Sequence, residues 1–219
     1  MTRSATITAG MACARRGILI ALSVLLCVTA RAQSYQDGDH YKTLEPPRPV
    51  ADATKVEVIE FFYYGCPVCY ETQPLLTRLL AQRCGDVVLL RIPAVSNEAW
   101  ANFARTFYAL EAVGEQSRLH WPLYDNHHFD GRQLNDEAKL LKWLGSNGVD
   151  AEQFRAIRDS DAVKAKVADA KKMVGAYGIK RVPSFVVGGK YVTSARAAGG
   201  VPEMMKVVDY LVGRVKAEK

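Results

Sequence analysis

A buried-strand pattern that leads into two closely spaced cysteines constrains this chain more than any other feature. Residues 56–64 are almost continuously apolar and rich in β-branched and aromatic side chains, and Gly65 ends the run. Such a run is typical of a strand buried on both faces of a sheet. The sequence Cys-Pro-Val-Cys follows at residues 66–69, and a helical pattern of leucines comes after it. The sequence therefore predicts a strand, a CxxC motif and a helix in direct succession.

The place of this motif at the start of a helix favours thiol redox chemistry. Free backbone N–H groups and the helix macrodipole stabilise an anion there, so we expect Cys66 to be an exposed nucleophile with a low pKa. Pro67 suits the first helical turn, because its missing N–H would have no partner there. Cys69 lies one turn further along, and we expect it to be the more buried thiol that resolves a mixed disulfide.

Two other uses of the cysteine pair have less support. A purely structural disulfide between them would close a very short loop and remove little entropy from the unfolded chain. A zinc site would need further ligands, but Cys84 stands alone and the adjacent His127 and His128 lack ligand spacing. We therefore expect no metal and no cofactor beyond a redox-active Cys66–Cys69 disulfide. Cys84 is expected to be a buried, inert thiol.

The first 32 residues have the pattern of a secretory signal peptide. Arginines precede a short apolar run at 17–28, and a small-residue cleavage site ends at Ala32. The run is too short to favour a permanent membrane anchor. Loss of residues 1–32 removes four arginines and no acid, which leaves 25 basic and 23 acidic side chains and a net charge of +2 rather than +6. Nucleic-acid binding therefore has little support, and export implies an oxidising compartment.

The rest of the chain divides into segments of different pattern. Residues 33–54 are polar and rich in proline, and we expect an extended lead without a regular element. Strand and helix patterns occupy 55–95, only helical patterns occupy 96–178, and 179–219 returns to a hairpin and a last helix. An α/β domain formed by the second and fourth segments, interrupted by an all-helical insertion, explains this order.

Two more positions are candidates for function. Glu60 interrupts the apolar strand, on the same side by parity as Val58, and a buried carboxylate is costly unless it has a partner such as a lysine or water. Pro183 follows Val182 at the start of the returning strand, where its missing N–H does no harm. Because cis X–Pro bonds are rare, the residues alone favour an ordinary trans bond at this position.

Histidine and aromatic side chains of the middle third have structural interpretations. His120, His127 and His128 lie in a stretch with no clear helical pattern, so we expect a solvated loop. A stripe of aromatic residues at helical spacing is expected in the core rather than in substrate contacts: Trp100, Phe103 and Phe107.

In their order along the chain, these motifs resemble the DsbA family of bacterial dithiol oxidases. The similarity runs from about His40 to the C-terminus and is closest at 60–62, 66–67, 69–70 and 186–191. It implies a thioredoxin fold with an inserted helical domain. It also implies a periplasmic monomer that donates its disulfide to unfolded or reduced exported proteins. A membrane quinone reductase of the DsbB type would then reoxidise it.

The resemblance also implies roles for individual residues beyond the cysteine pair. Pro183 is expected to form a cis bond that packs against the cysteines, and Glu60 to relay protons for the buried Cys69. Substrate contacts are expected from Pro67, Val68 and Val182.

One position departs from the common family pattern. The residue before the second cysteine is Val68, where a histidine is usual. A protonated histidine would stabilise the thiolate by charge and hydrogen bonding, and valine does neither. We therefore expect a higher Cys66 pKa and a weaker oxidant than in relatives that carry histidine.

Two alternative functions remain open at this point. One is a reductase or isomerase of the same fold, although isomerases of this kind usually carry a dimerisation domain for which the chain has no room. The other is a chaperone-like module that holds unfolded chains on the apolar surface around Val68 and Val182. Such a module would keep its function after Cys66→Ser, whereas an oxidase would lose it.

Overall fold

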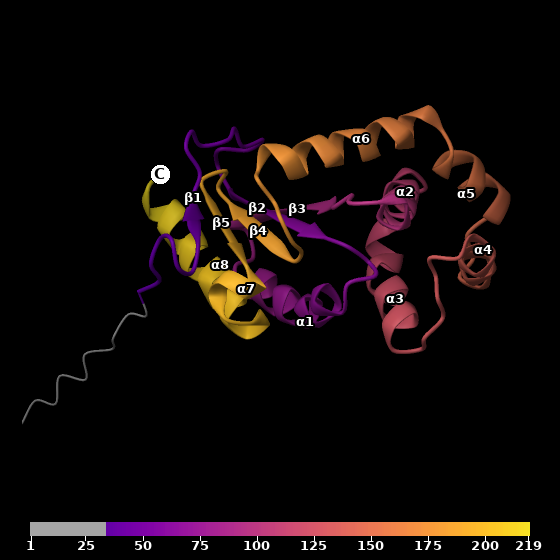
Figure 1. Cartoon of the computed structure of the whole chain (residues 1–219), viewed down its shortest axis with the longest axis horizontal. Coiled ribbons are helices and arrows are strands. Elements are labelled where there is room, and N and C mark those ends of the chain that lie inside the picture. The colour runs from indigo at the N-terminus through magenta and orange to yellow at the C-terminus, as the bar shows by residue number, and fades with distance from the viewer. Residues whose placement is uncertain (1–33) are drawn as a thin grey trace, which may run out of the picture. The chain divides into compact units, whose positions relative to one another are not determined.

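A five-stranded sheet organises residues 34–219, the part of the chain that the computed structural model describes (Figure 1). The strand order is β1-β5-β4-β2-β3, with β2 and β3 parallel and the other pairs antiparallel. The predicted signal peptide lies outside the described residues. The strands are β1 (Lys42–Thr43), β2 (Val56–Phe62), β3 (Val87–Pro93), β4 (Ser184–Val187) and β5 (Tyr191–Ser194).

Helices make up most of the remaining chain. The long central stretch between β3 and β4 is entirely helical, as the sequence predicts. The helices are α1 (Pro67–Gln82), α2 (Glu98–Ala112), α3 (Gln116–His128), α4 (Glu137–Ser146), α5 (Ala151–Arg158), α6 (Asp161–Ala176), α7 (Ala195–Ala198) and α8 (Val201–Ala217).

Strand β2 is buried on both faces because helices cover both sides of the sheet. Val58 points into a cluster with α1 and α8, where Leu76 and Leu211 are fully buried. Ile59, on the opposite face by the alternation of strand side chains, belongs to a second cluster that includes Val163 of α6. Figure 1 shows α6 running along one side of the sheet, with α1 and α8 on the other. This two-sided burial explains the continuous apolar run in the sequence.

Most helices between β3 and β4 begin with an N-cap residue, which explains why the sequence pattern predicts them. Asn97, Asp136, Asp150 and Ser160 each accept a hydrogen bond from a backbone N–H in the first turn of the helix that follows. The prediction that 96–178 forms an inserted domain, separate from the one built by 55–95 and 179–219, stays a prediction.

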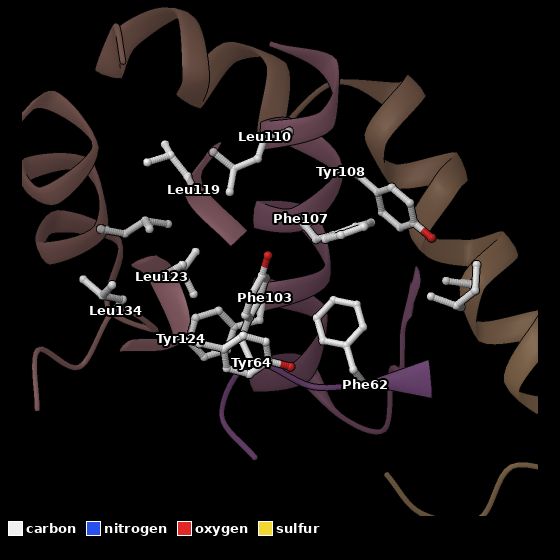
Figure 2. Packing of buried hydrophobic residues seen from close by; sticks show 14 of the residues in the cluster. Phe62, Tyr64, Phe103, Phe107, Tyr108, Leu110, Leu119, Leu123, Tyr124 and Leu134 are labelled. Carbon is white, nitrogen blue, oxygen red and sulfur yellow. The ribbon is translucent and has the colours of Figure 1, made fainter. Parts of the chain in front are cut away.

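An aromatic cluster joins the end of β2 to this helical stretch. Phe62 packs edge-on against Tyr64 and Phe107, with ring centroids 5.1 and 5.3 Å apart. Tyr64 in turn contacts Tyr124 of α3 at 4.8 Å and Phe103 of α2 at 5.6 Å. Figure 2 shows these rings converging between α2 and α3. Each such pair is worth about 0.5–1.5 kcal/mol beyond burial, so the cluster fixes where β2 ends.

The expectation of a lead without a regular element is wrong for a short piece of it. Lys42 and Thr43 form β1 and pair with β5 at the sheet edge. The polar composition concealed this strand because edge pairing uses backbone groups, whatever the side chains are. Tyr35 and Tyr41 anchor the same segment, since both are buried against the α8 side of the sheet.

Two local expectations are also wrong. His120, His127 and His128 lie on α3. This helix contains Pro122 and has a weak apolar pattern, so no helical signal marks it in the sequence. His120 is buried rather than solvated. Cys84 is exposed rather than buried, because α1 ends at Gln82 and the cysteine falls in the following turn.

We expect Gly189→Ala to destabilise the fold more than a glycine replacement at an open turn. Gly189 has a φ of +64°, and a methyl group there would lie 2.2 Å from the carbonyl oxygen of Arg48 in the N-terminal segment. Gly114 has a similar φ of +77° with open space around it, so Gly114→Ala is the matched control. We predict that Gly189→Ala lowers the free energy of unfolding in urea by at least about 2 kcal/mol, and that Gly114→Ala lowers it by about 1 kcal/mol. Equal losses would contradict the close packing of the N-terminal segment on the hairpin.

Candidate active site

The cysteine pair lies where β2 gives way to α1. The backbone N–H of Cys66 donates to the carbonyl of Tyr63, which closes a turn after the strand. Cys66 then has an extended backbone and is the N-cap residue of α1, while Pro67 occupies the first helical turn. Pro67 and Val68 are exposed beside the half-buried Cys66. The sequence prediction for the order strand, motif and helix is therefore confirmed.

The helix start lowers the pKa of Cys66. The backbone N–H of Cys69 donates to the Cys66 sulfur over 3.4 Å. The pKa of Cys66 falls from 9.0 to about 7, chiefly through a side-chain hydrogen bond with Cys69 and also through the backbone N–H groups of Cys69 and Val68, against an opposing effect of burial. About half of the Cys66 thiols are then ionised at neutral pH.

Cys69 has the opposite electrostatic environment. Its side chain is fully buried. Burial raises the pKa of the Cys69 thiol well above 9.0, and the neighbouring Cys66 and Glu60 add to the rise. Two chemically identical groups one helical turn apart thus differ in charge at neutral pH, which separates a nucleophile from a protonated partner.

The returning strand brings a proline loop to the same place. Val182–Pro183 is a cis peptide bond, as the family resemblance implies and the residues alone do not. The Cys66 thiol lies 3.9 Å from the carbonyl oxygen of Val182 and can donate a weak hydrogen bond to it. Pro183 is buried, and Val182 is half-buried.

Glu60 lies fully buried in β2 and has two partners. Its Oε1 atom accepts from Nε2 of Gln73 at 2.7 Å, and its Oε2 atom accepts from Nε of Arg91 at 3.1 Å. Gln73 Nε2 also lies 3.3 Å from the carbonyl oxygen of Cys69, so it links the carboxyl group to the buried cysteine's backbone. Burial raises the pKa of Glu60 even though Arg91 and Gln73 lower it.

Gln73 and Arg91 were not among the sequence candidates, although a signal for each exists. Arg91 interrupts the apolar strand β3 as Glu60 interrupts β2, and the two residues are direct neighbours in the parallel register. Gln73 follows Cys69 by four residues and so lies on the same helix face. A charged residue in each of two adjacent apolar strands is the pattern that could have predicted this pair.

Aromatic side chains surround the cysteine motif on two sides. Tyr63 stacks on Trp100 with ring centroids 4.1 Å apart. On the other side, Tyr70 stacks on both Trp121 and His128 at 5.2 Å. The core interpretation fits Phe103 and Phe107, which are buried, whereas Trp100 is only half-buried.

A small cavity lies next to the proline loop. It has a volume of about 170 Å³ and is lined by residues from three parts of the chain, among them Val95, Trp100, Val174 and Val182. Its wall therefore includes both the residue before the cis-proline and the half-buried tryptophan of α2.

The described residues, 34–219, contain no group of three or more His, Cys, Asp or Glu side chains suited to a metal ion. Within the same range, no helix is long and apolar enough to cross a membrane.

A thioredoxin-type sheet, a CxxC pair at a helix start and a cis-proline beside it define a thiol:disulfide oxidoreductase. A family model described as a DSBA-like thioredoxin domain matches residues 86–211. The thiol:disulfide interchange protein DsbA of Pseudomonas aeruginosa is 33% identical over 199 residues, which cover 91% of this chain and 94% of that protein. The Bordetella parapertussis protein of the same name is 33% identical over 197 residues, which cover 89% and 94%.

Solved structures of DsbA proteins are also similar to this chain. The crystal structure of Pseudomonas aeruginosa DsbA matches with a TM-score of 0.77 and 34% identity, over 86% of this chain and 99% of that one. Oxidoreductase DsbA from Xylella fastidiosa matches with a TM-score of 0.76 and 26% identity, over 84% and 98%. The chain belongs to the DsbA family. The predicted fold class and thiol:disulfide oxidoreductase activity are therefore confirmed, whereas the roles of individual residues stay predictions.

We expect the reduced Cys84→Ser variant of residues 33–219, which keeps only Cys66 and Cys69, to titrate in two well-separated thiol steps. Thiolate absorbance should rise with a midpoint near pH 7 for Cys66, and Cys69 should ionise only well above pH 9. Because folding lowers the Cys66 pKa, the reduced form gains stability as the pH rises from about 7 to about 9 and loses this gain as the pH falls through 7. Ultraviolet titration and urea unfolding across this range measure both effects.

Two variants control this experiment. Cys66→Ser should remove the step near pH 7 and leave the upper one. Val68→His should lower the midpoint by about one unit, since an imidazolium in the first turn would stabilise the thiolate. A single step above pH 8.5, or no response to Val68→His, would contradict this electrostatic account.

Proposed function

We propose that this protein is a periplasmic dithiol oxidase that transfers the Cys66–Cys69 disulfide to exported proteins. The difference in pKa between the two cysteines is the observation that carries the proposal. Membership of the DsbA family supports the substrate class. The signal pattern of residues 1–32 supports export from the cytoplasm.

The reaction proceeds by two exchanges in which sulfur bonds and electrons balance. A substrate thiolate attacks the Cys66 sulfur of the disulfide, forms a mixed disulfide and breaks the Cys66–Cys69 bond. The electron pair of that bond goes to the Cys69 sulfur, which takes up a proton. The second substrate thiolate then attacks the substrate sulfur of the mixed disulfide and releases Cys66 as a thiolate. The substrate dithiol is oxidised and the Cys66–Cys69 pair is reduced.

The lowered pKa of Cys66 favours the second exchange. A thiol of lower pKa leaves faster, and its thiolate is stabilised by the first-turn N–H groups of α1. Stabilisation of the reduced form also makes the disulfide a better oxidant, because the free energy of reduction includes the ionisation of Cys66.

We propose Glu60 as the source of the proton that Cys69 needs. Burial raises its pKa, which makes proton uptake by the carboxylate easier, and Gln73 and Arg91 hold it in position. In the reverse direction, during reoxidation, the carboxylate would accept the proton from Cys69. Glu60 therefore acts as a general acid and base for the buried thiol.

Substrate binding is proposed at the rim formed by Pro67, Val68 and Val182. Val68 is 37% exposed, which is high for an apolar side chain beside a reactive thiol. The adjoining cavity beside Trp100 offers apolar surface to a substrate side chain. Extended, unfolded chains expose both apolar side chains and backbone donors, so this rim suits them better than folded proteins.

The remaining parts of the proposal concern partners and state. We expect the protein to act as a monomer, with a DsbB-type membrane quinone reductase restoring its disulfide. A valine instead of the usual histidine at position 68 and a Cys66 pKa of about 7 also fit a reductase, which is the second candidate function.

The direct test uses the oxidised chain beginning at Gln33 and a reduced, unfolded protein that needs disulfides for its activity. We expect stoichiometric oxidation of the substrate and appearance of its activity, and loss of both with Cys66→Ser. Cys84→Ser is the matched control, because Cys84 is an exposed thiol outside the active site, and it should behave as the parent. Efficient reduction of substrate disulfides without net oxidation would favour the reductase instead.

We expect Glu60→Gln to slow proton transfer to Cys69 while sparing the thiolate of Cys66. The mixed disulfide should form about tenfold or more slowly than in the parent, since loss of a general acid costs at least that much in the step it serves. The midpoint of Cys66 ionisation should stay near pH 7. Rapid acid quenching with a labelled peptide thiol measures the rate.

The matched control is Glu57→Gln on the same strand. Glu57 is also buried, and its Oε2 atom accepts from the backbone N–H of Ala51 rather than from the active-site network. Equal effects of the two substitutions would show that Glu60 has only a structural role.

A further inference from the structure

A cavity of about 550 Å³ lies between α1 and α3, separate from the rim around Cys66. This volume is within the range of small-molecule sites. Polar and aromatic side chains share its wall: Gln73 and Thr77 from α1, Arg91 from β3, and Ser117, His120 and Trp121 from α3.

Arg91 offers an unused pair of donors to this cavity. Its Nε atom donates to Glu60, and its two terminal nitrogens have no hydrogen-bond partner in residues 34–219. Its side chain is 24% exposed, so the guanidinium is partly screened from water. A planar guanidinium with two free nitrogens matches the geometry of a carboxylate. Glu60 itself is fully buried and does not line the cavity.

His120 supplies a second donor that lacks a partner. Its ring is 94% buried, and Nδ1 lies 2.8 Å from the hydroxyl of Tyr64, while Nε2 has no partner among the described residues. Burial and the nearby Arg91 lower the pKa of His120 well below 6.5, so the ring is neutral. If Tyr64 donates to Nδ1, the ring proton lies on Nε2, and only this one N–H is left unsatisfied. The opposite tautomer would leave both the hydroxyl proton and Nε2 without partners, so we assign the first.

The cavity also has an apolar wall. Trp121 is 41% exposed and stacks on Tyr70, which holds its ring in place. Pro74 of α1 lines the same space. The cavity thus combines a partly exposed cation with a fixed aromatic surface, and its wall includes the buried, neutral His120.

We propose that this cavity binds a small organic carboxylate whose acid group bonds to the terminal nitrogens of Arg91 and whose apolar part packs on Trp121. Water satisfies the guanidinium but not the tryptophan surface, and a neutral apolar ligand satisfies only the latter. Binding at this site does not require the proposed oxidase function, although Gln73 and Arg91 belong both to its wall and to the network around Glu60.

The test is a titration of the folded protein with benzoate, with benzamide as its neutral isostere, followed by ¹H–¹⁵N NMR. We expect saturable shifts at the Trp121 indole N–H, at the Ser117 amide and at Nε2 of His120. We expect benzamide to bind about tenfold or more weakly, because it lacks the charge-assisted bonds to the guanidinium. Absence of saturable shifts, or equal binding of the two ligands, would overturn the proposal.

Three variants locate the site. Arg91→Gln should abolish benzoate binding, and because it also removes a partner of Glu60, its fold must be checked by circular dichroism. Ser117→Trp fills the cavity from an exposed position without touching Glu60 and should also abolish binding. Lys142→Gln removes a cation from a different cavity and should bind benzoate as the parent does. Binding retained in Ser117→Trp would place the ligand elsewhere and contradict the proposal.

Discussion

The contact between the Cys66 sulfur and the first turn of α1 is the interaction on which the active site depends. It forms only if β2 ends at Phe62 and the helix begins at Pro67, so that the cysteine between them becomes the N-cap. Burial of β2 on both faces and the aromatic cluster around Tyr64 fix that end point. The same helix carries Cys69 one turn into the core, where burial has the opposite effect on its pKa. One element boundary therefore creates two thiols of different chemistry.

The ion pair between the buried Glu60 and Arg91 costs desolvation free energy, so a functional role explains its presence better than a stabilising one. Replacing a buried pair by apolar side chains is often neutral or stabilising, whereas removing one partner costs about 3–5 kcal/mol. Glu60 and Arg91 occupy neighbouring positions in two strands that are otherwise apolar. Arg91 also faces the cavity between α1 and α3, so the acid near Cys69 and a solvent-accessible pocket share one guanidinium. We therefore expect ligand binding in that cavity to change the pKa of Glu60.

Local sequence patterns predicted most of the helices and strands. The features that they did not predict depend on contacts between segments distant in the chain. The strand, the CxxC motif, the capped helices and the hairpin each have a local signal, and all are present. Strand β1 has none, because its pairing with β5 uses only backbone atoms. The burial of His120 depends on Tyr64, 56 positions away, and no local periodicity records that contact. Likewise, the partners of Glu60 follow from the strand register, which the sequence leaves open.

The reduction potential of the Cys66–Cys69 pair tests the central claim most directly. Reference potentials are about −120 mV for DsbA and about −270 mV for thioredoxin, and the reference thiol pKa in DsbA is about 3.5. A thiol with a pKa of about 7 loses on the order of 100 mV of that oxidising power at neutral pH, if nothing else differs. We therefore predict roughly −220 mV against glutathione buffers, between the two reference potentials. A value of about −270 mV or lower would contradict an oxidase.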